Sequence, residues 1–112
     1  MRTALVLGVA AGLALCASSG AAQAPDGQAL YRQYCRTCHG LTGTPPQQML
    51  RIYSTLAPLD SAFLASRSQD SVVAVLRDGM GQMKGYKEKL TPEQLGAVAR
   101  YVRSFAAPAK AP

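Results

Sequence analysis

The feature that most limits the fold is a shortage of large apolar side chains. Residues 23–112 contain 25 of them, besides 12 alanines and two cysteines. A domain of about 90 residues buries only about 60–65% of its unfolded surface, and such small domains usually need a disulfide, a metal or a cofactor as an internal staple. The length of 112 residues allows one domain, which excludes a two-lobed enzyme or a complete dinucleotide-binding fold.

Residues 1–22 have the three-part pattern of a secretory signal peptide. Arg2 precedes an apolar run over residues 4–16, and small residues fill positions 17–24. The run of 13 residues is shorter than the roughly 20 that span a membrane. We therefore expect export to the periplasm, with cleavage between residues 21 and 24. The alternatives are a retained N-terminal anchor and, more weakly, lipid attachment at Cys16.

Removal of this leader changes both the charge and the cysteine count. The whole chain has 12 Lys and Arg against 6 Asp and Glu, a net charge of +6, which becomes +5 when Arg2 is lost. Only Cys35 and Cys38 remain. A disulfide across two residues would close a very short loop and constrain the unfolded chain little, so it would be a poor staple.

The mature chain is expected to form helices joined by loops. Asp26 and Ser68 are predicted N-caps, and heavy Gly and Pro punctuation indicates a loop over residues 40–58. The expected helical segments are 27–38, a short one at 47–53, a turn at 60–65, and 69–78, where alternation over 72–76 leaves a strand as the alternative. Residues 80–90 are expected to be a loop.

The last helix has the clearest signal. Thr91-Pro92-Glu93-Gln94 is a capping box with Pro at the first helical position. One apolar face follows at helical spacing, formed by Leu95, Val98, Ala99, Val102 and Phe105. The Pro/Ala-rich residues 107–112 are expected to be a flexible tail.

Residues 35–39 read Cys-Arg-Thr-Cys-His, which is the C-x-x-C-H pattern of c-type haem attachment. One turn of helix brings both sulfurs to one edge of a flat ring, where they can form two thioethers with the haem vinyl groups. The adjacent imidazole then reaches the iron. A redox dithiol would need a βαβ setting, and structural zinc would need four ligands where the mature chain offers three. Haem is therefore the preferred staple.

His39 is the only histidine in the chain, so two histidines from one chain cannot ligate the iron. The sixth ligand is then Met, Lys, water or nothing. The mature methionines are Met49, Met80 and Met83. Met49 follows His39 closely, whereas Met80 and Met83 lie beyond a full helix in a glycine-punctuated loop.

With these motifs, the chain resembles the class I monohaem cytochromes c of the small bacterial periplasmic kind. The resemblance covers nearly the whole mature chain and implies an all-α cytochrome c fold over residues 25–106, with about three to five short helices around one haem. The matching segments are Gly27 and Tyr31, Cys35-Arg36-Thr37-Cys38-His39-Gly40, Leu76-Arg77-Asp78-Gly79, Gly81-Gln82-Met83, Leu90-Thr91-Pro92-Glu93-Gln94, and Val98-Ala99-Arg100-Tyr101-Val102.

The resemblance also implies a set of haem contacts. Cys35 and Cys38 would attach one haem c, and His39 and Met83 would ligate its iron, although Lys84 stands where the family usually has Pro and Met80 remains a competitor. The carbonyl of Pro45 or Pro46 would accept a hydrogen bond from His39. The last helix would cross the first, with Val98 and Tyr101 contacting Gly27 and Tyr31.

The function that this implies is one-electron transfer rather than catalysis. Lys84, Lys87 and Lys89 form a basic patch that would steer a redox partner with an acidic docking face, and ordinary solubilising lysines are the alternative reading. Nucleic acid is not an expected partner. The chain would act as a monomeric carrier or as the cytochrome subunit of a larger dehydrogenase or oxidase complex, and less plausibly as a gas-binding or sensing haem protein.

Overall fold

The computed structural model describes residue 4, residues 8–14 and residues 23–106. Most of the expected signal peptide and the expected tail at 107–112 lie outside these residues. Residues 8–14 are irregular and exposed. No helix in the described ranges is long and apolar enough to cross a membrane.

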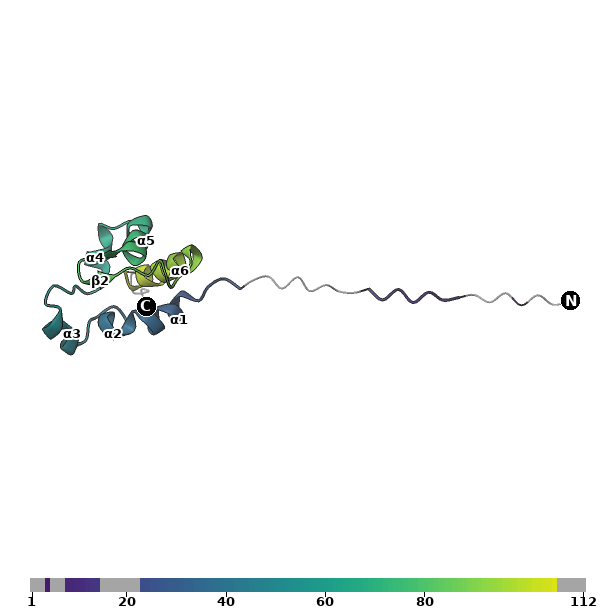
Figure 1. Ribbon diagram of the computed structural model, residues 1–112, viewed down its shortest axis with the longest axis horizontal. Coiled ribbons are helices and arrows are strands. Elements are labelled where there is room, and N and C mark those ends of the chain that lie inside the picture. Colours follow the sequence, from purple (N-terminus) through teal and green to yellow (C-terminus); the bar gives the residue numbers. More distant parts are fainter. Residues whose placement is uncertain (1–3, 5–7, 15–22, 107–112) are drawn as a thin grey trace, which may run out of the picture.

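Residues 23–106 form a domain whose regular elements are nearly all helices (Figure 1), so the expected all-α fold is confirmed. In chain order the elements are α1 (Gly27–Tyr34), α2 (Arg36–His39), α3 (Gln47–Ile52), α4 (Ser61–Ala65), α5 (Gln69–Asp78), β1 (Gly79–Met80), β2 (Met83–Lys84), α6 (Pro92–Arg103) and η1 (Ser104–Ala106).

Side-chain caps define where the helices begin. Asp26, Asp60 and Ser68 each accept a backbone N–H from the first turn of α1, α4 and α5, and Thr91 with Gln94 forms the complete capping box of α6. Each cap satisfies N–H groups that have no partner within the helix. The predicted starts of these helices are confirmed, and 72–76 is helix rather than strand.

Two predicted elements differ from the structure. The expected helix over 27–38 is divided at Cys35, which separates α1 from α2 and has a φ of −117°. The expected loop after α5 begins with an antiparallel hairpin in which Gly79 pairs with Lys84 and Met80 pairs with Met83. Gly81, at φ +56°, takes the first turn position, where glycine avoids the steric cost of a positive φ.

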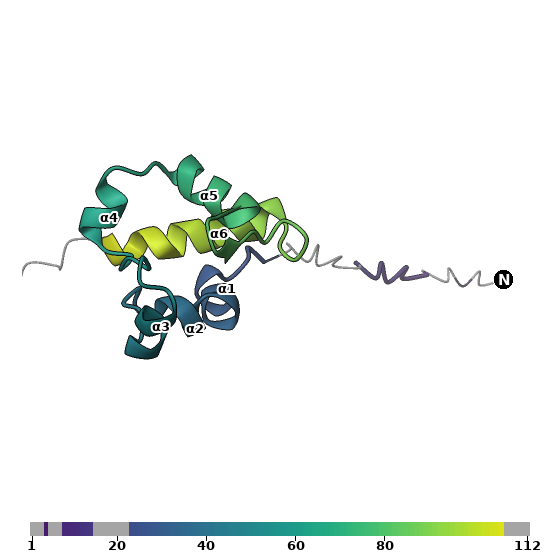
Figure 2. The same cartoon turned by 60° about the vertical axis from the view of Figure 1, so that its left-hand side comes forward.

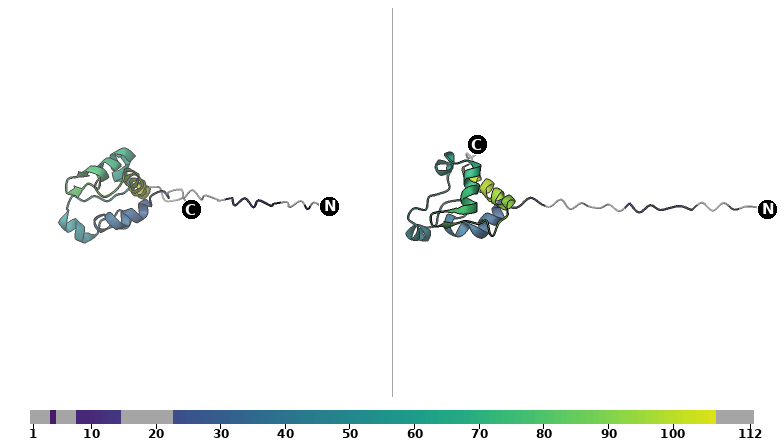
Figure 3. Two further views of the ribbon diagram at one scale, coloured as in Figure 1. Left: turned by 45° about the vertical axis from the view of Figure 1, so that its right-hand side comes forward. Right: turned by 45° about the horizontal axis from the view of Figure 1, so that its top comes forward.

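The long helix α6 passes between α4 and α5 on one side and α1, α2 and α3 on the other (Figure 2). Its predicted apolar face is buried, except that Phe105 falls in η1 and is half-buried against the core. Further views show α3 at the periphery of the domain (Figure 3), and none of its residues is buried.

The crossing of α1 and α6 brings two backbones together. A Cβ atom at Gly27 would overlap the carbonyl group of Ala97, so only glycine permits this approach. The Tyr31 ring packs edge-on against Tyr101, with ring centroids 5.3 Å apart. The sequence predicted this crossing with Val98 and Tyr101 as contacts; Val98 is buried in the core, while Ala97 provides the backbone contact.

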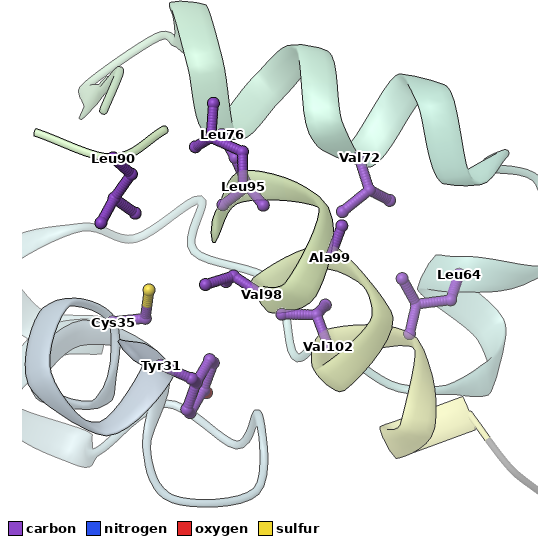
Figure 4. Close-up of a cluster of buried hydrophobic side chains, with 10 residues drawn as sticks. All are labelled: Tyr31, Cys35, Leu64, Val72, Leu76, Leu90, Leu95, Val98, Ala99 and Val102. Atoms are coloured by element: carbon purple, nitrogen blue, oxygen red, sulfur yellow. The ribbon is translucent and has the colours of Figure 1, made fainter. Parts of the chain in front are cut away.

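The buried side chains form one cluster to which α1, α4, α5 and α6 contribute (Figure 4). Tyr31 and Cys35 face α6 from one side, and Val72 and Leu76 of α5 approach it from the other. The cluster stops short of filling the domain, because two cavities lie beside it.

Candidate functional site

Two adjoining cavities lie between the Cys35–His39 segment and the β1–β2 hairpin. The larger has a volume of about 670 Å³ and the deeper, smaller one about 90 Å³. Both are lined by Cys35, His39, Phe63, Met80 and Met83. The larger volume falls in the range of pockets that bind cofactors and other small molecules.

One wall carries the C-x-x-C-H residues. Cys35 lies in the break between α1 and α2, and the turn that follows is closed by hydrogen bonds from His39 N–H to the Cys35 carbonyl (2.9 Å) and from Gly40 N–H to the Arg36 carbonyl (2.7 Å). Cys35 and Cys38 form no disulfide with each other. Cys35, Cys38 and His39 all line the larger cavity, so the turn presents its three reactive side chains to the same space.

Tyr31 fixes the end of this turn. Its side chain is wholly buried, and its hydroxyl group donates a 2.7 Å hydrogen bond to the carbonyl of Gly40, the residue after His39. Burial raises the pKa of the Tyr31 hydroxyl group far above its usual range. The hydroxyl group therefore keeps its proton and remains a donor throughout the physiological pH range.

Burial also sets the protonation of the two residues that begin and end the motif. It raises the pKa of the Cys35 thiol to about 11, with a smaller contribution from Cys38. It lowers the pKa of His39, because desolvation disfavours the charged imidazolium. His39 is therefore neutral at pH 7 and can offer a ring nitrogen to a metal.

One ring nitrogen of His39 lacks a hydrogen-bond partner in the part of the chain that the structure describes. Its Nδ1 atom is buried and has no hydrogen-bond partner among the described residues, so the expected bond to Pro45 or Pro46 is absent. The Pro46 carbonyl instead accepts the N–H groups of Met49 and Leu50 at the start of α3. A buried imidazole beside two cysteines and a large cavity fits a covalently held haem, because the other ring nitrogen, Nε2, would be available to ligate the iron.

The opposite wall is the hairpin. It is joined to α5 by hydrogen bonds from Tyr86 N–H to the Leu76 carbonyl (2.8 Å) and from Lys87 N–H to the Arg77 carbonyl (3.2 Å). Met80 and Met83 line both cavities. The structure thus brings the predicted residues Cys35, Cys38, His39 and Met83 to one cavity, together with the competing Met80. Met49 is in α3 and lines neither cavity.

Phe63 and Arg67 are among the cavity-wall side chains that sequence reasoning did not single out. Phe63 lines both cavities, and Arg67 lines the deeper one. The Arg67 guanidinium group lies 3.7 Å from the centroid of the Phe63 ring and donates a 2.6 Å hydrogen bond to the Phe63 carbonyl. Their spacing of four residues next to a helix was the available signal.

Three lysines lie in or just after the hairpin, and one of them reaches the larger cavity. Lys84, Lys87 and Lys89 are exposed, and Lys84 lines the larger cavity. Nearby, Arg77 and Asp78 form an exposed ion pair with a 2.7 Å N–O distance. This pair lowers the pKa of Asp78, mainly through the hydrogen bond from Arg77. Asp78 also interacts with the charge of Lys87, and the exposed Glu88 lies between Lys87 and Lys89 in the sequence, so carboxylates partly offset the charge of these three lysines.

With two thiols, an imidazole and thioether sulfurs around one cavity, comparison with known proteins becomes informative. A family model described as cytochrome C oxidase, cbb3-type, subunit III matches residues 22–102. The chain belongs to this family of c-type cytochromes. As a c-type cytochrome it carries covalently bound haem c and transfers electrons.

Two curated relatives differ in how much of their length the cytochrome matches. It is 33% identical over 104 residues to cytochrome c55X of Paracoccus denitrificans, covering 90% of this chain and 92% of the relative. It is 31% identical over 110 residues to dihydro-heme d1 dehydrogenase of Pseudomonas aeruginosa, covering 96% of this chain and 20% of that protein. The second match therefore concerns only a cytochrome-sized part of a longer protein.

Solved structures agree with this family and fold. The KustC0563 c-type cytochrome has a TM-score of 0.66 at 33% sequence identity, covering 73% of this chain and 99% of that one. A mutant of the same protein has a TM-score of 0.63, also at 33% identity, covering 71% and 98%. The cytochrome is thus a small, class I-like c-type cytochrome.

Proposed function

We propose that this cytochrome is a periplasmic one-electron carrier with one haem c, attached through Cys35 and Cys38 and ligated by His39 and Met83. The observation that carries the proposal is that these four side chains line the same cavity from two facing elements, the α1–α2 turn and the hairpin. Residues 1–22 serve as the signal peptide, residues 25–106 as the cytochrome domain and residues 107–112 as a tail.

The side chains around the cavity suit electron transfer. The bound haem supplies an iron that accepts and releases one electron. Burial keeps His39 neutral, and a thioether such as Met83 raises the reduction potential. The wall formed by Phe63, Val72 and Leu76 keeps water from the centre, which also favours the reduced state. With His39 and Met83 as its ligands, the iron would have no open position for a substrate.

Mass spectrometry and difference spectroscopy of the exported protein test this proposal. We expect a mass increase of one haem per mature chain and a reduced-minus-oxidised c-type spectrum. Cys35→Ala and Cys38→Ala should each leave a single thioether, which shifts the spectrum because one vinyl group stays unsaturated. A protein without haem, or carbon monoxide binding to the reduced form at neutral pH, would contradict the proposal.

The basic patch of Lys84, Lys87 and Lys89 is proposed as the docking face for an acidic redox partner. Charge reversal in Lys84→Glu/Lys87→Glu should slow electron exchange with a carboxylate-coated electrode and weaken its salt dependence. Arg51→Glu/Arg100→Glu is the matched control, because it changes the net charge equally through exposed residues that line neither cavity. Equal slowing by both variants would show that net charge, not the patch, controls the encounter.

The second candidate function is that of a cytochrome subunit in a larger redox complex. Two observations favour it: the matching family is described as an oxidase subunit, and the dehydrogenase relative contains a matching segment within a much longer chain. Affinity purification of the tagged cytochrome at low salt tests it. A stoichiometric partner that carries another redox cofactor would favour the subunit over the free carrier.

A further inference from the structure

The hairpin presents two sulfur atoms, not one, to the cavity. Met80 and Met83 are directly paired across the two-residue turn of Gly81 and Gln82, and directly paired residues of an antiparallel hairpin lie on the same face. Both methionines accordingly line both cavities.

The two methionines differ in burial. Met83 is half-buried and packs against the core cluster, whereas Met80 keeps 57% of its surface exposed. In this structure Met83 is therefore the more deeply placed of the two methionines. Inward rotation of Met80 would hide apolar surface that now faces water, and methionine, with three rotatable bonds, makes such a move easily.

The tip of the hairpin has room to change its backbone conformation while its base stays in place. The base is held by the hydrogen bonds of Tyr86 and Lys87 to the end of α5. At the tip, a Cβ on Gly81 would meet no atom within 4 Å, so the turn has free space around it. Lys84 follows Met83, and without a proline at that position the backbone φ is not locked.

We propose that Met80 is a second thioether ligand for the haem iron, which exchanges with Met83 at the same coordination position. The inference rests on the proposed His39 and Met83 ligation and adds a second occupant for the distal position. In the exchange one sulfur–iron bond breaks and another forms. No electron or proton is transferred, so no further reactant is required.

The far-red sulfur-to-iron absorption of the ferric protein is the readout, since it reports a thioether ligand independently of activity. Four leucine variants of the haem-loaded cytochrome are compared: Met83→Leu, Met80→Leu, the double variant, and Met49→Leu as the matched control. Leucine has a similar volume and no sulfur, so core packing is largely conserved. Far-UV circular dichroism verifies that each variant is folded.

Exchange predicts that the band survives, weaker or shifted, in Met83→Leu, is unchanged in Met80→Leu and Met49→Leu, and vanishes in the double variant. Complete loss in Met83→Leu would overturn the inference and leave the proposed ligation intact. Loss in Met80→Leu with retention in Met83→Leu would overturn the ligation itself. A band that persists in the double variant would overturn both.

A measurement on the wild-type protein covers the case in which Met83→Leu does not fold. With ¹³C-methyl-labelled methionine, the methyl group of a haem-ligating residue is strongly displaced by the ring current of the haem. Saturation transfer between the Met83 and Met80 methyl signals of the reduced protein would support exchange. The absence of transfer would overturn it. Assignment uses the Met80→Leu and Met49→Leu variants.

Discussion

The hydrogen bond from Tyr31 to Gly40 can be removed with little other disturbance. Tyr31→Phe deletes only the hydroxyl group, so the ring keeps its edge-on contacts with Tyr101 and Phe105, each at 5.3 Å between centroids. What is lost is the 2.7 Å bond to the Gly40 carbonyl. Since Gly40 follows His39, the substitution acts at the end of the attachment turn.

The size of the effect follows from burial. Tyr31 has no exposed surface, whereas Gly40 is half-buried, so its carbonyl regains only part of the lost bond from water. A hydrogen bond contributes about 0.5–1.5 kcal/mol net, and a buried unpaired acceptor costs about 1–3 kcal/mol. We therefore expect the free energy of unfolding to fall by about 1–2 kcal/mol. For a domain of this size that lowers Tm by roughly 4–16 °C.

Thermal unfolding of the haem-loaded protein, followed by far-UV circular dichroism, measures this loss. Tyr101→Phe is the matched control: it lies in the same aromatic group, and its hydroxyl group has no hydrogen-bond partner within the described part of the chain. A Tm for Tyr31→Phe equal to that of the wild type, or an equal fall in Tyr101→Phe, would refute the reasoning.

Two further substitutions examine the crossing of α1 with α6 and the start of α6. Gly27→Ala would force a methyl group into the carbonyl of Ala97 and should cost about 1–3 kcal/mol in urea unfolding. Gly96→Ala is its control, because only the end of a flexible side chain approaches that position, at 3.4 Å. This variant should stabilise the protein by about 0.5–1 kcal/mol. Equal destabilisation by both variants would contradict the close backbone contact at the crossing. Thr91→Ala removes the hydroxyl group that accepts the Gln94 N–H and should lower the free energy of unfolding by about 1 kcal/mol. An unchanged midpoint of urea unfolding would contradict this role of the cap.

Local chemistry made much of the fold predictable from the sequence. The capping side chains Ser68 and Thr91 act within their own first turn, so the starts of α5 and α6 follow from a few neighbouring residues. The C-x-x-C-H spacing likewise identified Cys35, Cys38 and His39 as neighbours on one turn.

The remaining features depend on contacts between distant parts of the chain. The break at Cys35 and the Met80–Met83 pairing arise where the chain meets the cavity, and neither has a strong local signal. The contact of Gly27 with Ala97, rather than Val98, depends on the rotation of α6 about its axis. The place of Arg67 beside Phe63 appears only once the cavity wall is assembled.

The crossing of α1 with α6 has a consequence for how the chain matures. The two helices are far apart in the sequence, although they touch in the fold. Tyr31 therefore obtains its partners Tyr101 and Phe105 only after almost all residues have been synthesised. Contacts so far apart in sequence slow folding. An N-terminal fragment that ends before α6 would have its attachment motif but would lack the central core residues Leu95, Val98, Ala99 and Val102, so the domain could close around its motif only once its last helix is present.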